Sequence, residues 1–115
     1  MKCYWVNSEE HTVTETEFSS LADIRQMIGG HLELAYQWLN GDVLYVNEDG
    51  LRLCRDHWFA LLQRTDQFFA GNGVLVGPEL PEDDWEDGHS NYDPKTPLRL
   101  FEQYVVFVEG ELNDY

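Results

Sequence analysis

With 115 residues, of which 43% are apolar and 14% aromatic, the chain has the size and composition of one folded domain. Its 22 acidic and 7 basic residues give a formal net charge of −15, which repels nucleic acid phosphates and anionic membranes. These values exclude a disordered acidic chain, a second domain of ordinary size and direct binding to DNA or RNA.

The N-terminal third predicts a hairpin followed by a short helix. Residues 3–6 are aromatic and β-branched, and residues 12–18 alternate like a strand with one face in water. A turn over residues 7–11 would pair these two strands. The next apolar residues have helical spacing after a candidate N-cap at Ser20, and the helix is expected to end at Gly29.

The middle of the chain predicts a second hairpin. Asn40-Gly41 is a strong signal for a tight turn between strands at 34–39 and 43–46. A further turn leads into residues 51–54, which are expected to form a third strand of the same meander.

Two apolar runs follow, and they receive different predictions. Residues 58–62 (WFALL) are expected to form a largely buried helix, because Asp56 can cap it and the run is too contiguous for a solvated face. Residues 68–73 predict a tight turn. The continuous run at 74–77 is typical of a central strand that is covered on both faces.

The C-terminal third predicts an acidic loop, a short helix and a last strand. Residues 78–94 are crowded with acids and turn residues, which favours a long loop. Thr96 and Pro97 are expected to be the N-cap and first residue of a helix that continues from 98 to 104, before a strand at 105–108.

Together these elements predict a single α+β domain over residues 1–115. Its main feature is an antiparallel sheet of short, hairpin-connected strands, accompanied by two or three short helices. A homodimer is a possible further state. If it forms, the strand at 105–108 is the expected edge, because an uncovered apolar edge invites pairing.

Three stretches combine turn glycines with strand residues: 28–33 (IGGHLE), 46–51 (VNEDGL) and 69–77 (FAGNGVLVG). Read together, they resemble a family of small phage- and plasmid-borne proteins of unknown function, and the resemblance spans about half of the chain. It implies a gene on a mobile element, where small acidic proteins often act on host defence machinery. The resemblance carries no catalytic residue, and the acidic loop is not part of the matched pattern.

Residues that could carry chemistry are sparse. Cys54 and His57 have the spacing of half a zinc site and are also the one candidate nucleophile and base, but a buried thiol beside a half-exposed histidine explains them more simply. An EF-hand alignment with Gly88 at its sixth position places Trp85 and Pro94 where calcium ligands belong. We therefore expect no catalytic residue, no metal and no cofactor.

The leading hypothesis for function rests on the excess of negative charge. Residues 77–115 hold 11 acids against Lys95 and Arg99. A domain of this length has a diameter on the order of 35 Å, and duplex DNA of that length carries roughly 20 phosphate charges. We therefore expect a non-catalytic acidic inhibitor, of anti-CRISPR or anti-restriction type, that mimics DNA in the basic site of a host defence protein. Partner binding is expected at Trp85, as an anchor, and at six acids: Glu79, Glu82, Asp83, Asp84, Glu86 and Asp87.

Other functions fit the same sequence. An immunity protein that neutralises a basic toxin, such as a nuclease, belongs to the same physical class, and a small enzyme using Cys54 and His57 belongs to another. The charge could also be that of a halotolerant or merely soluble domain, and Trp85 could fold back to anchor the loop.

A cytoplasmic location is expected, in the host cell if a phage encodes the chain. No apolar run approaches the roughly 20 residues that cross a bilayer, and the opening MKCYWV lacks the apolar core of a signal peptide. Cys3 and Cys54 are too few for a disulfide framework and are expected to be buried.

Overall fold

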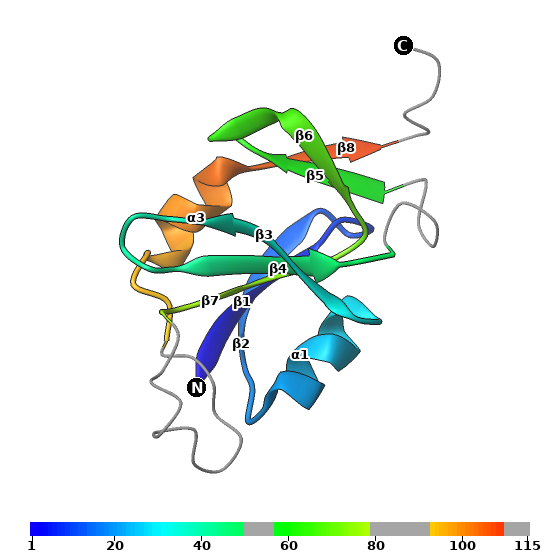
Figure 1. The fold of residues 1–115 in the computed structure, drawn as a ribbon. Coiled ribbons are helices and arrows are strands. Elements are labelled where there is room, and N and C mark those ends of the chain that lie inside the picture. The colour runs from blue at the N-terminus through cyan, green and yellow to red at the C-terminus, as the bar shows by residue number, and fades with distance from the viewer. Residues whose placement is uncertain (50–56, 79–92, 110–115) are drawn as a thin grey trace.

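The structure is a computed structural model that describes residues 1–49, 57–78 and 93–109. These ranges contain eight strands and two helices (Figure 1). In chain order they are β1 (Lys2–Asn7), β2 (Thr12–Glu17), α1 (Leu21–Ile28), β3 (Leu32–Gln37), β4 (Val43–Asn47), β5 (His57–Leu61), β6 (Arg64–Ala70), β7 (Gly73–Val76), α3 (Leu98–Tyr104) and β8 (Val105–Glu109). Neither of these helices, with eight and seven residues, is long and apolar enough to cross a bilayer.

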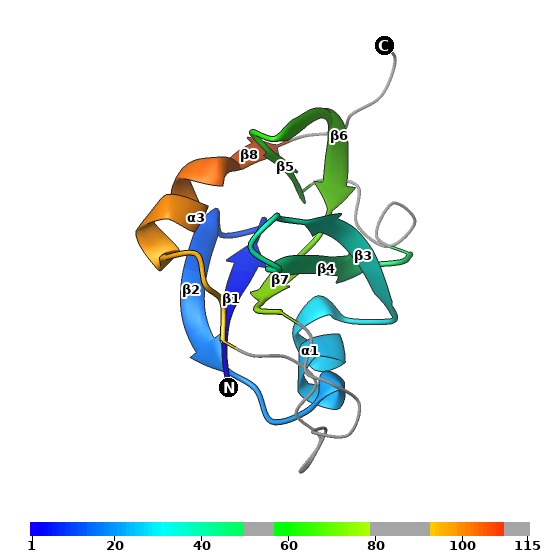
Figure 2. The ribbon, with the colours of Figure 1, turned by 60° about the vertical axis from the view of Figure 1, so that its left-hand side comes forward.

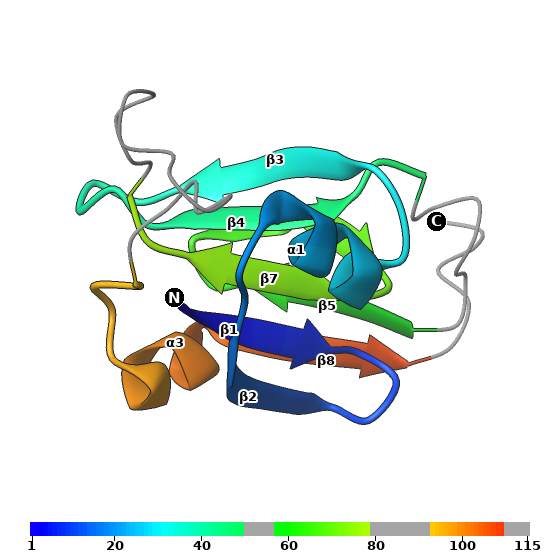
Figure 3. The same ribbon diagram turned by 90° about the horizontal axis from the view of Figure 1, so that it is seen from below.

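The strands form two antiparallel sheets that lie one above the other (Figures 1 and 2). Sheet A has the strand order β2-β1-β7-β4-β3, and sheet B has the order β6-β5-β8. Helix α1 covers the face of sheet A that is turned away from sheet B (Figure 3). This arrangement confirms a mainly antiparallel α+β fold with short helices.

Strand β7 lies at the centre of sheet A, as the apolar run at 74–77 predicted. Val74 and Val76 are fully buried in the cluster that α1 supplies with Ile24 and Ile28. Leu75, between them, is fully buried in the other cluster, which faces sheet B. Successive side chains of a strand point to opposite faces, so a strand covered on both faces needs an unbroken apolar run.

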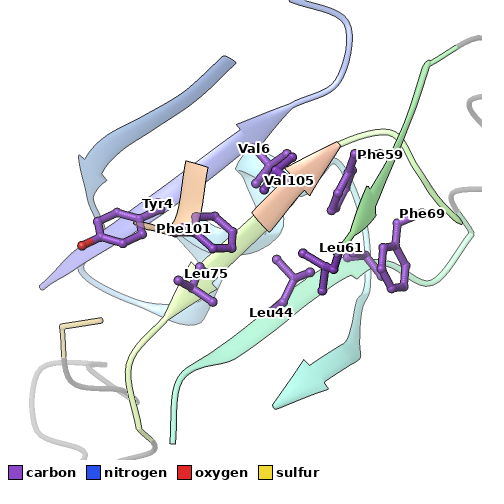
Figure 4. Packing of buried hydrophobic residues seen from close by; sticks show 10 residues of the cluster. Tyr4, Val6, Leu44, Phe59, Leu61, Phe69, Leu75, Phe101 and Val105 are labelled. Carbon is purple, nitrogen blue, oxygen red and sulfur yellow. The ribbon is translucent and has the colours of Figure 1, made fainter. Parts of the chain in front are cut away.

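The larger hydrophobic cluster fills the space between the two sheets (Figure 4). Sheet B contributes Phe59, Leu61 and Phe69, while α3 contributes Phe101. The residues of sheet A that meet them are Tyr4, Val6, Leu44, Val46 and Leu75. The two sheets therefore stabilise one another through one shared core.

Gly73 of sheet A lies directly against the ring of Phe59 from sheet B. A Cβ built on it would lie 2.8 Å from Phe59 Cζ and 3.3 Å from Leu44 Cδ1. We expect Gly73→Ala to lower the free energy of unfolding by about 1–3 kcal/mol, because the added methyl overfills a packed core. Urea denaturation will measure this loss. The double variant with Phe59→Leu should cost less than the sum of the single changes, and strict additivity would contradict the contact.

The helix predicted at 58–62 is wrong, because this segment is strand β5. Phe59 and Leu61 face the core between the sheets, whereas Trp58 and Ala60 lie on the other side of the strand and are also buried. A short apolar run buried on both sides has the same pattern in a helix and in a strand. The turn predicted at 68–73 is also too long, since β6 continues to Ala70.

The helix boundaries are largely confirmed. Gly29 ends α1 with φ of 88°, the left-handed conformation that glycine adopts without strain. Ser20 is the N-cap residue, but its side chain makes no cap bond. Pro97 is the N-cap of α3, so the prediction of Thr96 at this position is wrong by one residue. The strand predicted at 51–54 lies outside the described ranges.

Candidate functional site

All seven residues predicted to bind a partner lie in residues 79–92, outside the described ranges. We call this stretch the acidic segment, since its 14 residues include six acids and no lysine or arginine. The structure describes the chain on both sides of it, from Pro78 backward and from Asp93 onward. The geometry of these two ends therefore decides how the segment is held.

The chain enters the acidic segment after Pro78, and this end rests on the turn between β3 and β4. Gly41 in that turn has φ of 98°, and a Cβ built on it would lie 2.8 Å from Pro78 Cγ. The ring of Pro78 thus packs directly on the backbone of Gly41. This contact needs both the conformation and the small size of glycine.

The chain emerges from the acidic segment at Asp93. This returning end, residues 93–96, is bound to the same part of the fold. The backbone N–H of Lys2 donates to Asp93 Oδ1 at 2.6 Å, and the Tyr4 hydroxyl donates to the Thr96 carbonyl at 2.7 Å. Both bonds tie residues 93–96 to strand β1. Figure 1 shows this returning stretch, in yellow, between the edge of sheet A and the start of α3.

Asp42 is the principal anchor of the returning end. Its side chain is completely buried, and its carboxylate accepts four hydrogen bonds. The donors are Lys95 N at 2.8 Å, Thr96 N at 2.8 Å, Thr96 Oγ1 at 2.6 Å and, more weakly, Asn40 Nδ2 at 3.4 Å. Such multiple donation stabilises a carboxylate away from water.

One turn therefore holds both ends of the acidic segment: Gly41 contacts Pro78, and the next residue, Asp42, binds Lys95 and Thr96. Asn40-Gly41 predicts a hairpin turn, but the sequence pattern does not reveal the role of Asp42. An aspartate directly after an Asn-Gly pair was the available signal, but its partners lie more than 50 residues away.

The base of the segment, by which we mean the region of the fold that holds its two ends, has a mixed, mainly negative electrostatic environment. The pKa of the Tyr4 hydroxyl is raised, first by burial and then by the negative charges of Glu15, Asp42 and Asp93. Glu15 and Asp93 are exposed. Lys2 and Lys95 are the exposed cations that the described structure places here. The acidic segment thus joins the fold in a region that already carries exposed carboxylates.

A hollow of about 460 Å³ opens beside this base and is lined mainly by apolar and aromatic side chains. Trp38 lies between two tyrosines: Tyr36 meets it edge-on at 4.7 Å and Tyr104 stacks at 6.5 Å, measured between ring centroids. The indole Nε1 of Trp38 is buried and has no hydrogen-bond partner among the described residues. Leu39 and Leu100 are exposed at the hollow.

The cysteines and His57 are the residues on which candidate chemistry was considered: Cys54 and His57 as a catalytic pair, and Cys3 as a buried thiol. Cys3 is fully buried under α1, and burial raises the pKa of its thiol to about 11, so it is protonated at neutral pH. His57 begins strand β5, whereas Cys54 lies outside the described ranges, so the pair is not tested. In the described part of the chain, no three His, Cys, Asp or Glu side chains gather as metal ligands.

Comparison with known proteins identifies a family. Residues 1–90 match the family model described as a domain of unknown function, DUF3846, which agrees with the uncharacterised family expected from the sequence. Searches of curated proteins and of solved structures gave no match. The matched region runs from β1 through β7 and ends inside the acidic segment. Because the match covers well over half of the chain, the chain belongs to the DUF3846 family.

Proposed function

We propose that the protein is a non-catalytic acidic inhibitor from a mobile element. Its partner is the basic nucleic-acid-binding site of a host defence protein, such as a CRISPR effector or a restriction enzyme. The observation that carries this proposal is the acidic segment itself, with six acids in 14 residues and both ends held by the turn at Gly41 and Asp42.

Fixing both ends supports binding in a physical way. A tethered segment explores fewer conformations than a free acidic tail, so less entropy is lost when a partner orders it. The concentrated charge accelerates association with a basic groove and forms charge-assisted bonds with its arginines. Both effects require acids that are close together, and a net charge spread evenly over the surface would not provide them.

The hollow beside the base complements the charges. Carboxylates at an interface rim provide steering and specificity, whereas apolar contacts near the centre commonly provide most of the affinity. Trp38, Leu39 and Leu100 offer such contacts next to the point where the segment returns. In this proposal Trp85 is the corresponding apolar anchor within the segment.

The decisive experiment compares two variants of equal charge. The segment variant E82Q/D83N/D84N/E86Q/D87N and the control variant E9Q/E10Q/E33Q/E48Q/E102Q each remove five carboxylates, so both change the net charge from −15 to −10. The control residues are exposed and lie outside the acidic segment. We expect the segment variant to lose about 100-fold in affinity for the partner, and the control to lose less than about 5-fold.

The partner for this measurement comes from capture on the immobilised protein, followed by elution with a duplex of about 20 base pairs. A DNA mimic is displaced by DNA, and its affinity falls as salt rises. Equal losses in the two variants, or capture that duplex DNA does not compete, would contradict the proposal. A toxin nuclease as the captured protein would instead indicate an immunity protein.

A further inference from the structure

The sequence contains two Asn-Gly pairs, Asn40-Gly41 and Asn72-Gly73. An asparagine in this pair is especially prone to spontaneous deamidation, because glycine carries no side chain that would keep its nitrogen away from the neighbouring amide. In an unfolded chain the two pairs have the same chemistry. The surroundings that the fold gives each pair therefore decide which asparagine reacts in the native protein.

The reaction at Asn40 needs only water. The backbone nitrogen of Gly41 attacks the Asn40 side-chain carbon Cγ, and the new N–C bond closes a succinimide ring while the bond from Cγ to Nδ2 breaks. The proton lost from the Gly41 N–H leaves with Nδ2 as ammonia. Water then adds to one of the two ring carbonyls and breaks its bond to the Gly41 nitrogen. The product is aspartate or isoaspartate, and either one adds a negative charge.

The Asn72-Gly73 pair is held by sheet A. Gly73 is the first residue of β7 and is buried, with Val6 of β1 on one side and Val46 of β4 on the other. In a central strand the N–H of each paired residue points to a neighbouring strand, so the Gly73 nitrogen is not free to attack. Reaction at Asn72 therefore requires the sheet to open, which costs close to the free energy of global unfolding.

The Asn40-Gly41 pair, in contrast, is held by the turn between β3 and β4, where Asn40 is exposed. The Gly41 N–H donates to the Trp38 carbonyl at 3.0 Å. The Asn40 side chain accepts from Asp42 N at 2.9 Å and donates through Nδ2 to Thr96 Oγ1 at 3.1 Å. These bonds occupy both reacting groups, but they belong to one exposed turn, which opens at a lower cost than a central strand.

We propose that Asn40 is a site of spontaneous deamidation in the folded protein, and that it reacts when the β3–β4 turn opens locally. The modification acts on the anchor beside it. Asn40 Nδ2 donates to Asp42 Oδ2 at 3.4 Å as well as to Thr96 Oγ1. A carboxylate at position 40 has no donor for either oxygen and places a second negative charge beside the buried Asp42. Deamidation therefore weakens the hold of the turn on Thr96.

Peptide mapping by mass spectrometry during incubation in a mildly alkaline buffer tests the proposal, since deamidation adds about one dalton to the affected peptide. The rates are measured in the folded protein and in concentrated urea, where both pairs are unprotected and should react within about 3-fold of one another. In the folded protein we expect Asn40 to react about 10- to 100-fold more slowly than in urea, and Asn72 at least about 10-fold more slowly again.

Two variants separate local from global opening. Thr96→Val removes the hydroxyl that accepts from the Asn40 side chain, and it should accelerate Asn40 at least about 3-fold. Leu61→Ala is the matched control, because Leu61 is fully buried in the core between the sheets. It should accelerate Asn72 at least about 10-fold and leave Asn40 within about 2-fold of the wild type. Leu61→Val replaces it if circular dichroism shows that Leu61→Ala is unfolded.

Asn40→Asp reproduces the aspartate product. It should lower the urea midpoint more than Asn72→Asp, since the Asn72 side chain donates at 3.5 Å to the Met27 carbonyl and faces no buried carboxylate among its described partners. Equal stability of the two variants would contradict the effect on the anchor.

The rates decide the site itself. If Asn40 were as strongly protected as Asn72, or were accelerated equally by Leu61→Ala, its reaction would need global unfolding and the proposal would be wrong. If Asn40 reacted as fast in the folded protein as in urea, the turn would not control it. None of these measurements involves a partner, so this proposal and the proposed function fail independently.

Discussion

Replacing Asp42 by alanine is expected to lower the free energy of unfolding by about 3–5 kcal/mol, because several buried donors lose their acceptor. The Lys95 and Thr96 backbone N–H groups and the Thr96 hydroxyl all donate to this carboxylate. None of these groups can recover its bond without the returning end of the acidic segment moving. Urea denaturation followed by tryptophan fluorescence will measure the loss.

Two further variants separate the carboxylate from simple packing. Asp42→Asn keeps the shape and one carbonyl acceptor, but it places an amide N–H against a backbone donor, so a smaller loss of about 1–3 kcal/mol is expected. Asp93→Ala removes an exposed carboxylate that accepts a hydrogen bond from the Lys2 backbone N–H, and should cost less than about 1 kcal/mol. If Asp42→Ala were no more harmful than Asp93→Ala, the anchoring role of Asp42 would be wrong.

Phe59→Ala should be comparably damaging, with an expected loss of about 3–5 kcal/mol, since it leaves a cavity in the core between the sheets. Phe59 is completely buried, lies 5.4 Å from Phe69 between ring centroids, and packs against Gly73. Its deletion therefore removes contacts with both sheets at once.

The matched control is Phe68→Ala, on the neighbouring strand. Phe68 is 42% exposed on the side of β6 opposite to Phe69, and its truncation should cost less than about 1.5 kcal/mol. The comparison is made by chemical denaturation under identical conditions. Similar losses for the two variants would mean that β5 and β6 do not have the inner and outer faces described above.

Local signals in the sequence predicted a large part of this fold. Gly41, in the Asn40-Gly41 turn, and Gly29 both have a positive φ that favours glycine, and both the hairpin and the helix end were found there. The central strand at 74–77 was also predicted from its unbroken apolar run. The run at 58–62 has the same appearance, and only its neighbours β6 and β8 make it a strand.

The candidate site was less accessible to such reasoning. Its charge is visible in the composition, and the seven residues predicted for partner binding remain a prediction. Asp42, in contrast, was missed because its function in the fold depends on contacts with Lys95 and Thr96, which no periodicity or local motif encodes. Trp38 packs against the core between the sheets and also lines the open hollow, a double position that the sequence pattern does not reveal.

The turn at Gly41 and Asp42 also allows the sequence of the acidic segment to vary independently of the rest of the fold. The contacts that the structure describes between this turn and the two ends of the segment are with Pro78, Lys95 and Thr96, and none of these residues lies between positions 79 and 92. A lineage under pressure from changing targets can thus diversify this stretch rapidly while the scaffold stays constant. Antibody frameworks and their hypervariable loops divide the same two tasks.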